Sequence, residues 1–430
     1  MTMKRVFTGV LYAAIASASM HGFAADKPGI AAHTEVYASV GEELRHYSLT
    51  SGSLISGSQT NNGASLKLDE TLRLPATIQF AVADRAHRHL YVISSNISAT
   101  NPGDVNLLNV FTIDQHSGRL TALGSPVNLK ERPIHLTLDR EGRYALVAYN
   151  KSATLSVHPI EKDGQVGAAI EQQQPVQAGI FTHQVTVMPS NKFVIAAGRG
   201  NDGTPGHPED VGTLTTFTYT NGQLGQGSRV EFEPTVGPRH VAYAPKTSLA
   251  YVATERGSKI YTYKIADSGQ LAEHASFKTS TLDPHWKPEA DEGIKKGGVI
   301  QLSPDGKFLY VTNRSDETVS KGGQTVFKHG ENDIVTYALD AKTGEPKLLQ
   351  HIDSQGIEAR TFAVLADQHL LIVGNQKSGL VTKDGKVLEI KANLAVFKIR
   401  PDGRLKFVEK YEISDPTKSL MWVDAYSIGG

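Results

Sequence analysis

The chain of 430 residues contains no cysteine. This absence excludes disulfides, thiolate metal sites, iron–sulfur clusters and cysteine nucleophiles. Basic and acidic residues both number 44, and without a basic excess the chain is not expected to bind nucleic acid. Hydrophobic residues make up 39% of the sequence, which is enough for a large folded core.

Long hydrophobic runs are also lacking, apart from one at the N-terminus. Residues 1–24 combine Lys4 and Arg5 with an apolar stretch and with the small residues Gly22 and Ala24 before Ala25. This order is typical of a cleaved signal peptide, and the stretch is shorter than the ~20 residues that a membrane-spanning helix needs. Because export without cysteine fits an oxidising compartment, we expect a periplasmic protein with no membrane contact after cleavage.

What the sequence does have is an internal repeat. Short runs of β-branched and aromatic residues recur between Gly, Asp, Asn and Pro, as is typical of strands and turns. One marker residue can be chosen in each run, at intervals of 48 to 62 residues: Val36, Val92, Val147, Ile195, Val252, Val311 and Val373. After each marker come an alternating strand and a turn of the type Gly-x-Leu, such as Gly269-Gln-Leu271.

Seven units of about four short strands predict an all-β fold, a seven-bladed β-propeller with four antiparallel strands per blade. We expect it to form a single domain over residues 31–430. The first unit lacks an innermost strand, and we expect residues 419–427 to supply it, so that strands from both termini close the ring. Three segments exceed the repeat and are predicted as loops on the faces: 200–212, 282–297 and 320–333.

The register of the repeat brings polar residues to one mouth of the central channel. The innermost strand of each unit begins about twelve residues before the marker, and its hairpin partner ends three residues after the marker. Start and end are neighbours in an antiparallel pair, so both sets should surround the same mouth. The first position carries His135, His183, Arg239, His240 and Arg360. The second carries Asn150, Glu255 and Arg314.

Around these residues the sequence resembles a known family. The segments that carry the resemblance are Gly237-Pro-Arg-His240, Tyr251-Val-Ala-Thr-Glu255, Val311-Thr-Asn-Arg314 and Ala359-Arg-Thr-Phe362. They are similar to the seven-bladed propeller lactonases, which include the bacterial propeller type of 6-phosphogluconolactonase and the fungal carboxymuconate lactonizing enzyme. The resemblance covers residues 34–415. It implies a site made of His183, Arg239, Glu255 and Arg314, which the repeat register also selects.

Lactone hydrolysis needs a base for water, positive charge for the oxyanion and contacts that orient the ring. We predict His183 as the base, because a glutamate between two arginines keeps a low pKa. Glu255 would then orient His183 or the water. Arg239 and Arg314 would hold an anionic group and the oxyanion, and His240 would donate to the leaving hydroxyl. The expected ligand is a small lactone or another anion, acted on by a monomer without a cofactor.

The remaining candidates are predicted to bind substrate. They are His135, His240, Asn150, Asn313, Arg360 and Trp286, the last by stacking on a sugar from its loop. Trp422 is expected in the core. No metal is predicted, because the adjacent arginines would repel a cation. A calcium cage is therefore disfavoured, and a transition metal on the three channel histidines is the weaker alternative.

Two other functions stay open at this stage. Phe181-Thr182 before His183, Gly198-Arg199-Gly200, and Gly298-Val299 depart from the pattern of the lactonases. Since a fold does not determine a function, a non-catalytic periplasmic propeller that binds a ligand or a protein is one alternative. A cyclase that protonates a muconate-like diacid is the other.

Overall fold

The computed structural model describes residues 33–50, 64–98, 103–285, 296–328, 330–365, 367–383 and 386–429. The signal peptide predicted for residues 1–24, and Trp286, lie outside these ranges. The described residues form 32 strands, and no helix among them is long and apolar enough to cross a membrane. The all-β prediction is confirmed.

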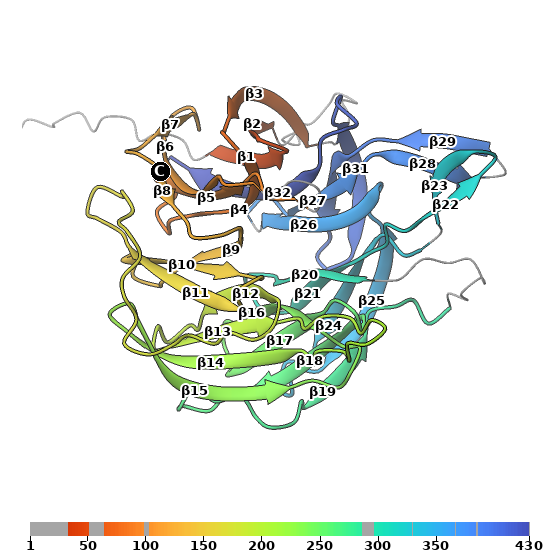
Figure 1. The fold of residues 1–430 in the computed structure, drawn as a ribbon. Helices are drawn as coiled ribbons and strands as arrows, with labels where there is room; N and C mark the ends of the chain where they lie inside the picture. Colours follow the sequence, from red (N-terminus) through yellow and green to blue (C-terminus); the bar gives the residue numbers. More distant parts are fainter. Residues whose placement is uncertain are drawn as a thin grey trace, which may run out of the picture.

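Seven sheets form the blades, and consecutive innermost strands touch one another in a closed ring (Figure 1). From the channel outward, blade one contains β32 (Leu420–Ile428), β1 (His33–Val40), β2 (Glu43–Thr50) and β3 (Ser65–Arg73). Blade two contains β4 (Thr77–Ala83), β5 (His89–Ser95), β6 (Asn106–Ile113), β7 (Leu120–Ala122) and β8 (Val127–Asn128). Blade three contains β9 (Pro133–Leu138), β10 (Tyr144–Tyr149) and β11 (Thr154–Pro159).

The other four blades have four strands each. Blade four contains β12 (Thr182–Val187), β13 (Phe193–Gly198), β14 (Thr213–Thr220) and β15 (Gln223–Glu231). Blade five contains β16 (Pro238–Tyr243), β17 (Leu249–Thr254), β18 (Lys259–Lys264) and β19 (Phe277–Ser280). Blade six contains β20 (Lys296–Leu302), β21 (Phe308–Arg314), β24 (Asp333–Leu339) and β25 (Pro346–Asp353). Blade seven contains β26 (Ile357–Leu365), β27 (Leu370–Lys377), β30 (Asn393–Ile399) and β31 (Leu405–Glu412).

The burial of each strand follows its place in the blade. The second strand of a blade, such as β17, is covered on both faces by neighbouring blades, and every one of its residues is buried. Its sequence is therefore a continuous apolar run. The outermost strands face solvent on one side, and β15 alternates between buried or half-buried and exposed residues, as a half-buried strand should.

A repeated tyrosine contact joins successive blades. The hydroxyl of a tyrosine on one blade donates to the carbonyl of the glycine in the Gly-x-Leu turn of the next. The pairs are Tyr37–Gly118 (2.6 Å), Tyr91–Gly164 (3.1 Å), Tyr251–Gly344 (2.8 Å) and Tyr310–Gly403 (3.2 Å). Glycine is required at Gly403, because its φ is 82° and a Cβ would lie 2.2 Å from the ring of Phe308. The tyrosine next to the marker and the glycine of the Gly-x-Leu turn are thus the two halves of one interface between blades.

The ring is closed as predicted. β32 pairs with β1 along its whole length and serves as the innermost strand of blade one. Leu420 packs in the core between blades one and seven, beside Gly374, where a Cβ would come within 2.4 Å of it. Trp422 is only 1% exposed, which confirms its expected place in the core.

One predicted loop is wrong in part. The segment 320–333 does not form a simple loop, because β22 (Thr318–Lys321) and β23 (Gln324–Phe327) make a hairpin. A second hairpin, β28 (Gly379–Lys383) and β29 (Lys386–Ile390), leaves blade seven, and β23 pairs with β28 in parallel. This four-stranded hairpin sheet stands clear of the blades (Figure 1). It links blades six and seven outside the ring.

The closing strand provides a test of the ring. Leu420→Ala leaves a cavity in a well-packed core, and such changes cost about 2–5 kcal/mol. We expect the free energy of unfolding, measured with denaturant, to fall by that amount. Leu348→Ala, at a leucine that is 44% exposed, is the matched control and should change it by less than about 0.5 kcal/mol. Equal effects of the two variants would contradict the closure.

Candidate active site

Every innermost strand carries an irregularity near its start. At this point the pairing with the second strand skips one residue of the innermost strand in every blade except blade six. In blade six it skips two adjacent residues. The skipped residues are Gln79, Ile134, His183, Arg239, Gly298 with Val299, Arg360 and Met421. A bulge of this kind re-aims side chains. It interrupts the strict alternation of faces, so Arg239 and the adjacent His240 can both reach the channel.

The pairing corrects the register of blade four. In blades two, three, five, six and seven the marker pairs with the residue eleven positions before it, as Val252 pairs with Val241. In blade four the residue with this spacing is Ala196, which pairs with Val185, and not Ile195. His183 therefore stands at the level of Arg239, and Gln184 stands at the level of His240.

The same shift reveals a residue that the sequence analysis missed. With Ala196 as the marker, Arg199 takes the position that Glu255 has in blade five. Its Nη1 donates to Glu255 Oε1 at 3.1 Å, and its guanidinium lies 4.1 Å from the ring centre of Phe181. The corrected spacing alone would have identified it.

Glu255 is the centre of the site and is buried among three arginines. Its Oε2 accepts bonds from Arg239 Nε at 2.9 Å and from Arg314 Nη2 at 2.8 Å, while Oε1 accepts from Arg199. Burial opposes its ionisation, but Arg314 and Arg239 outweigh this and hold the pKa of Glu255 at about 2. It is therefore a permanently charged anchor for the arginines. Its carboxylate has no bond to His183 among the described contacts, so the predicted orienting role is not seen.

A second carboxylate, Glu358, was not predicted. Its Oε1 accepts from Arg314 Nη1 at 2.8 Å, and its Oε2 lies 3.2 Å from Lys377 Nζ. The backbone of Glu358 has a φ of 59°, and its N–H donates to Asn332 Oδ1 at 2.8 Å. Left-handed non-glycine residues of this kind are uncommon and often occur at functional sites.

We call these residues the mouth cluster: Arg199, Arg239, Glu255, Arg314, Glu358, Arg360 and Lys377. Beside it, Lys296 and Lys377 share Asp316 at 2.9 and 2.6 Å. Together the group has six cations and three carboxylates.

The pKa of Arg360 falls to about 10, chiefly through burial and then through Arg314. Burial, reinforced by Arg314, also lowers the pKa of Arg239. Arg239 and Arg314 are buried, whereas Lys296 and Lys377 are half-buried. A surplus of positive charge in such partly buried surroundings is costly and suits an anionic ligand.

Three histidines lie against the mouth cluster. The ring centre of His240 is 5.1 Å from that of His183 and 5.9 Å from that of His135. All three are buried, and the Nδ1 atom of each has no hydrogen-bond partner among the described residues. Burial, and then Arg239, lower all three histidine pKa values, that of His135 to about 3. The rings are therefore neutral at physiological pH.

The other predicted binding residues have mixed outcomes. Arg360 joins the cluster, with Nη1 3.2 Å from Gln376 Oε1 and 3.8 Å from Glu358. Asn150 lies in the turn after β10, half-buried. Asn313 is fully buried and faces away from the mouth, because it donates to Thr281 O and to Glu331 Oε2. We therefore assign Asn313 to packing between blades five and six.

Two clusters among the described residues bring histidine and carboxylate ligand atoms close enough for a metal ion. They are Glu35–His46–Asp69 and Glu331–Asp333–His351. Neither contains His135, His183 or His240. The channel histidines are therefore not preassembled as a metal site.

The charge of Glu255 provides a test through pH. Its folded pKa of about 2 is below the ordinary 4.5, so its stabilisation is complete above pH 4.5 and is lost as the pH falls towards 2. In Glu255→Gln the arginines lose their anchor, and the free energy of unfolding at pH 7 should drop by about 3 kcal/mol or more.

The variant should also lose less stability than the wild type between pH 4.5 and 2.5. Urea unfolding as a function of pH measures both effects. Glu273→Gln, at an exposed glutamate, is the control and should follow the wild-type curve. An identical acid slope in Glu255→Gln would disprove the assignment.

Comparison with known proteins agrees with this architecture. The sequence model described as lactonase, 7-bladed beta-propeller, matches residues 44–384. The 6-phosphogluconolactonase of Pectobacterium carotovorum is 31% identical over 258 residues, 59% of this chain and 69% of that protein. That of Bacillus subtilis is 24% identical over 277 residues, 63% of this chain and 70% of that protein.

Two solved structures share the fold at lower sequence identity. The periplasmic gluconolactonase of Pseudomonas aeruginosa has a TM-score of 0.67 and 20% identity, covering 92% of this chain and 99% of that one. A putative 6-phosphogluconolactonase from Bacteroides fragilis has a TM-score of 0.67 and 16% identity, covering 94% and 100%. With seven blades, a closed ring and a match over most of its length, the chain belongs to the seven-bladed β-propeller lactonase family.

Proposed function

We propose that this protein hydrolyses a small anionic or sugar-derived lactone at the mouth cluster, without a metal. The observation that carries the proposal is the surplus of buried and half-buried cations beside neutral histidines. The cations can bind an anionic substrate and stabilise the oxyanion, and a neutral imidazole can accept a proton. The distant relationship to 6-phosphogluconolactonases supports the same reaction class.

The three arginines that were considered for substrate differ in what they can still bind. Each of the three side-chain nitrogens of Arg314 already has an acceptor, in Gly297 O, Glu255 or Glu358. The Nη2 atom of Arg239 has no hydrogen bond to another described residue. In Arg360, Nη1 is the one side-chain nitrogen with a hydrogen bond to a described residue. Arg314 therefore braces the two carboxylates, while Arg239 and Arg360 can receive substrate oxygens.

The reaction is then a water attack at the acyl carbon. His183 takes a proton from the water as its oxygen bonds to that carbon, and Arg239 stabilises the oxyanion. When the intermediate collapses, the bond between the acyl carbon and the ring oxygen breaks, and the proton on His183 passes to that oxygen. His183 thus takes the donor role that the sequence analysis gave to His240. The products are a hydroxyl group and a carboxylic acid, which releases one proton to solvent at neutral pH.

The low pKa of His183 has a consequence for substrate choice. Burial lowers this pKa first, and then Arg239, His240 and Arg360 lower it further. An anionic substrate among the arginines offsets their charge, so the pKa of His183 rises in the complex and the imidazole becomes a stronger base. This coupling favours an anionic lactone over a neutral one.

We also propose that the mature protein is periplasmic. The order of charged, apolar and small residues in 1–24 supports this, together with a structural neighbour described as a periplasmic gluconolactonase.

A second function is favoured by the burial of the cluster: Arg239 is 1% exposed and Arg314 4%. Such closure also suits a non-catalytic propeller that holds an anion.

A lactone panel tests hydrolysis. After EDTA treatment we expect turnover of an aldonolactone or a phosphorylated lactone, because the proposed site needs no metal. His183→Ala and Arg239→Ala should each lower kcat/KM by about 10²–10³, as expected for a base and an oxyanion donor. His274→Ala and Arg229→Ala, at exposed positions, are the matched controls. Loss of turnover with EDTA, or full activity in His183→Ala, would refute the proposal. Saturable anion binding without turnover would support the second function.

The pH profile gives an independent check of the base. Since the pKa of His183 lies well below 6.5, the free enzyme keeps its base unprotonated as the pH falls from 8 to 6. We therefore expect kcat/KM to stay level over this range and to decline only at lower pH. A decline centred near 6.5 would indicate a solvent-exposed histidine instead.

A further inference from the structure

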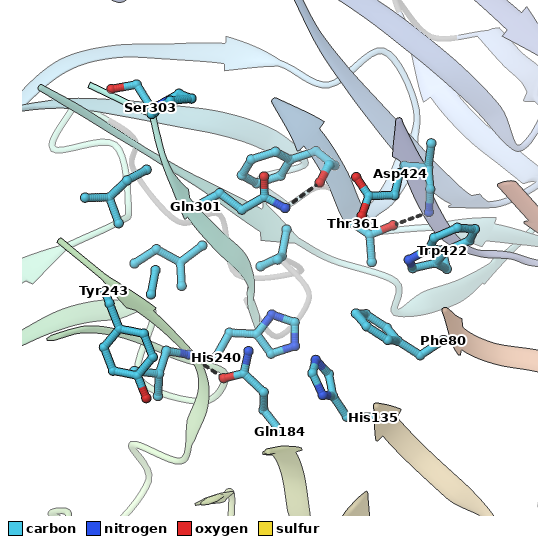
Figure 2. Close-up of a pocket in the computed structure, with 18 of the residues that line it drawn as sticks. Phe80, His135, Gln184, His240, Tyr243, Gln301, Ser303, Thr361, Trp422 and Asp424 are labelled. Carbon is cyan, nitrogen blue, oxygen red and sulfur yellow. Dashed lines mark hydrogen bonds between the residues drawn. The ribbon is translucent and has the colours of Figure 1, made fainter. Parts of the chain in front are cut away.

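The central channel contains a cavity on the other side of the histidines from the mouth cluster. Its volume is about 420 Å³, within the range of small-molecule sites. His135 and His240 line one end of it. Tyr243, the last residue of β16, and Ser303, which follows β20, line the other. The cavity therefore extends towards the opposite face of the propeller (Figure 2).

The lining of this cavity differs in charge from the mouth cluster. Among the described residues that line it there is no lysine or arginine, and Asp424 is the one carboxyl group. Burial raises the pKa of Asp424 to about 6, and the carboxylate accepts bonds from Ala425 N and Tyr426 Oη. His135 and His240 are neutral, as described above. An anion would meet Asp424 here with no cationic side chain in the wall to balance it.

The two histidines border the cavity without offering it their Nδ1 atoms. The Nδ1 atoms of His135 and His240 have no hydrogen-bond partner among the described residues, but protein encloses both atoms, so an occupant of the cavity cannot reach them. Any hydroxyl group in the cavity therefore has to find its partners elsewhere in the wall.

Two glutamines add complementary groups. Gln184 uses its Oε1 to accept from Val241 N at 2.6 Å, and Gln301 uses its Nε2 to donate to Phe362 O at 2.8 Å. Each bond fixes one end of an amide against the next blade. The other ends, an N–H₂ donor on Gln184 and an acceptor oxygen on Gln301, have no bond to a described residue. Figure 2 shows both side chains at the cavity.

We propose that this cavity is a second binding site, which takes an uncharged polyhydroxylated molecule of monosaccharide size. Three features support it together: the volume, the absence of cationic side chains among the described lining residues, and a donor and an acceptor amide held in place on different blades. The site lies outside the mouth cluster, and binding in it requires no hydrolysis.

The chain supplies its own reporter for the test. Trp286 and Trp422 are its two tryptophans, and Trp422 lines the cavity. In a Trp286→Phe background, titration with D-glucose should change the emission of Trp422 in a saturable way. D-gluconate, with a similar skeleton and a negative charge, should produce a midpoint at least about tenfold higher, if it binds in the cavity at all.

Two variants test the location. Gln184→Met keeps the length of the side chain and removes its amide, while Ala242→Leu adds bulk to the wall of the cavity. Each should weaken glucose binding at least about tenfold. Ala266→Leu makes the same change at an exposed turn and should leave the midpoint within about twofold. Near-ultraviolet circular dichroism and thermal unfolding establish that each variant is folded.

Three results would overturn the proposal. They are the absence of saturation with any neutral sugar, which would mean that the cavity holds water only; equal or tighter binding of gluconate; and unchanged midpoints in both Gln184→Met and Ala242→Leu. Since emission reports occupancy and not turnover, failure here leaves hydrolysis at the mouth cluster unaffected. Failure of the lactone panel likewise leaves the glucose titration valid.

Discussion

The skipped pairing near the start of every innermost strand is the constraint on which the site depends. An uninterrupted strand would send consecutive side chains to opposite faces, and only one of Arg239 and His240 could reach the channel. With the bulge, blade five contributes both, together with Glu255 from the partner strand. Because the bulges lie at one level around the ring, four neighbouring blades can gather charged groups in a single layer.

This layer borders a chemically different part of the channel. In the layer, carboxylates are enclosed by arginines and lysines whose charge they do not fully neutralise. In the cavity beyond it, the walls are amides, imidazoles, aromatic rings and the carboxyl group of Asp424. Such a boundary is sustained by burial, because charges in a low-dielectric interior interact strongly over short distances. Glu255 and Glu358 keep the like-charged arginines together, so the positive layer is stable only with both carboxylates in place.

Much of this could be predicted from the sequence, because the repeat is strong. Seven markers determine the number of blades, and the missing strand of the first unit determines how the ring closes. Arg239, Glu255 and Arg314 follow from the register alone. Blade four was misplaced by one residue because Val194, Ile195 and Ala196 are all small or apolar, and nothing in the sequence distinguishes which of them is the marker. Arg199 was missed for this reason.

Other features depend on contacts that no local pattern contains. Glu358 reaches Arg314 because its backbone turns into the left-handed region, held by Asn332 from another strand connection. The hairpin sheet joins segments more than fifty residues apart in the chain. Asn313 sits beside Arg314 in the sequence and yet points the other way. In each case the deciding information is tertiary, and the sequence offers only residues of the right type.

The tyrosine contact between blades also limits how this architecture can vary. Each contact uses a side chain on one blade and a backbone carbonyl on the next, so the acceptor is a backbone atom that a glycine turn presents. An engineered ring could therefore exchange a blade for its neighbour, provided that the tyrosine and the glycine turn are transplanted together. An exchange that moves the tyrosine without the glycine turn would separate the hydrogen-bond donor from its acceptor. The unit that can be exchanged is therefore a pair of adjacent blades, and successive pairs overlap.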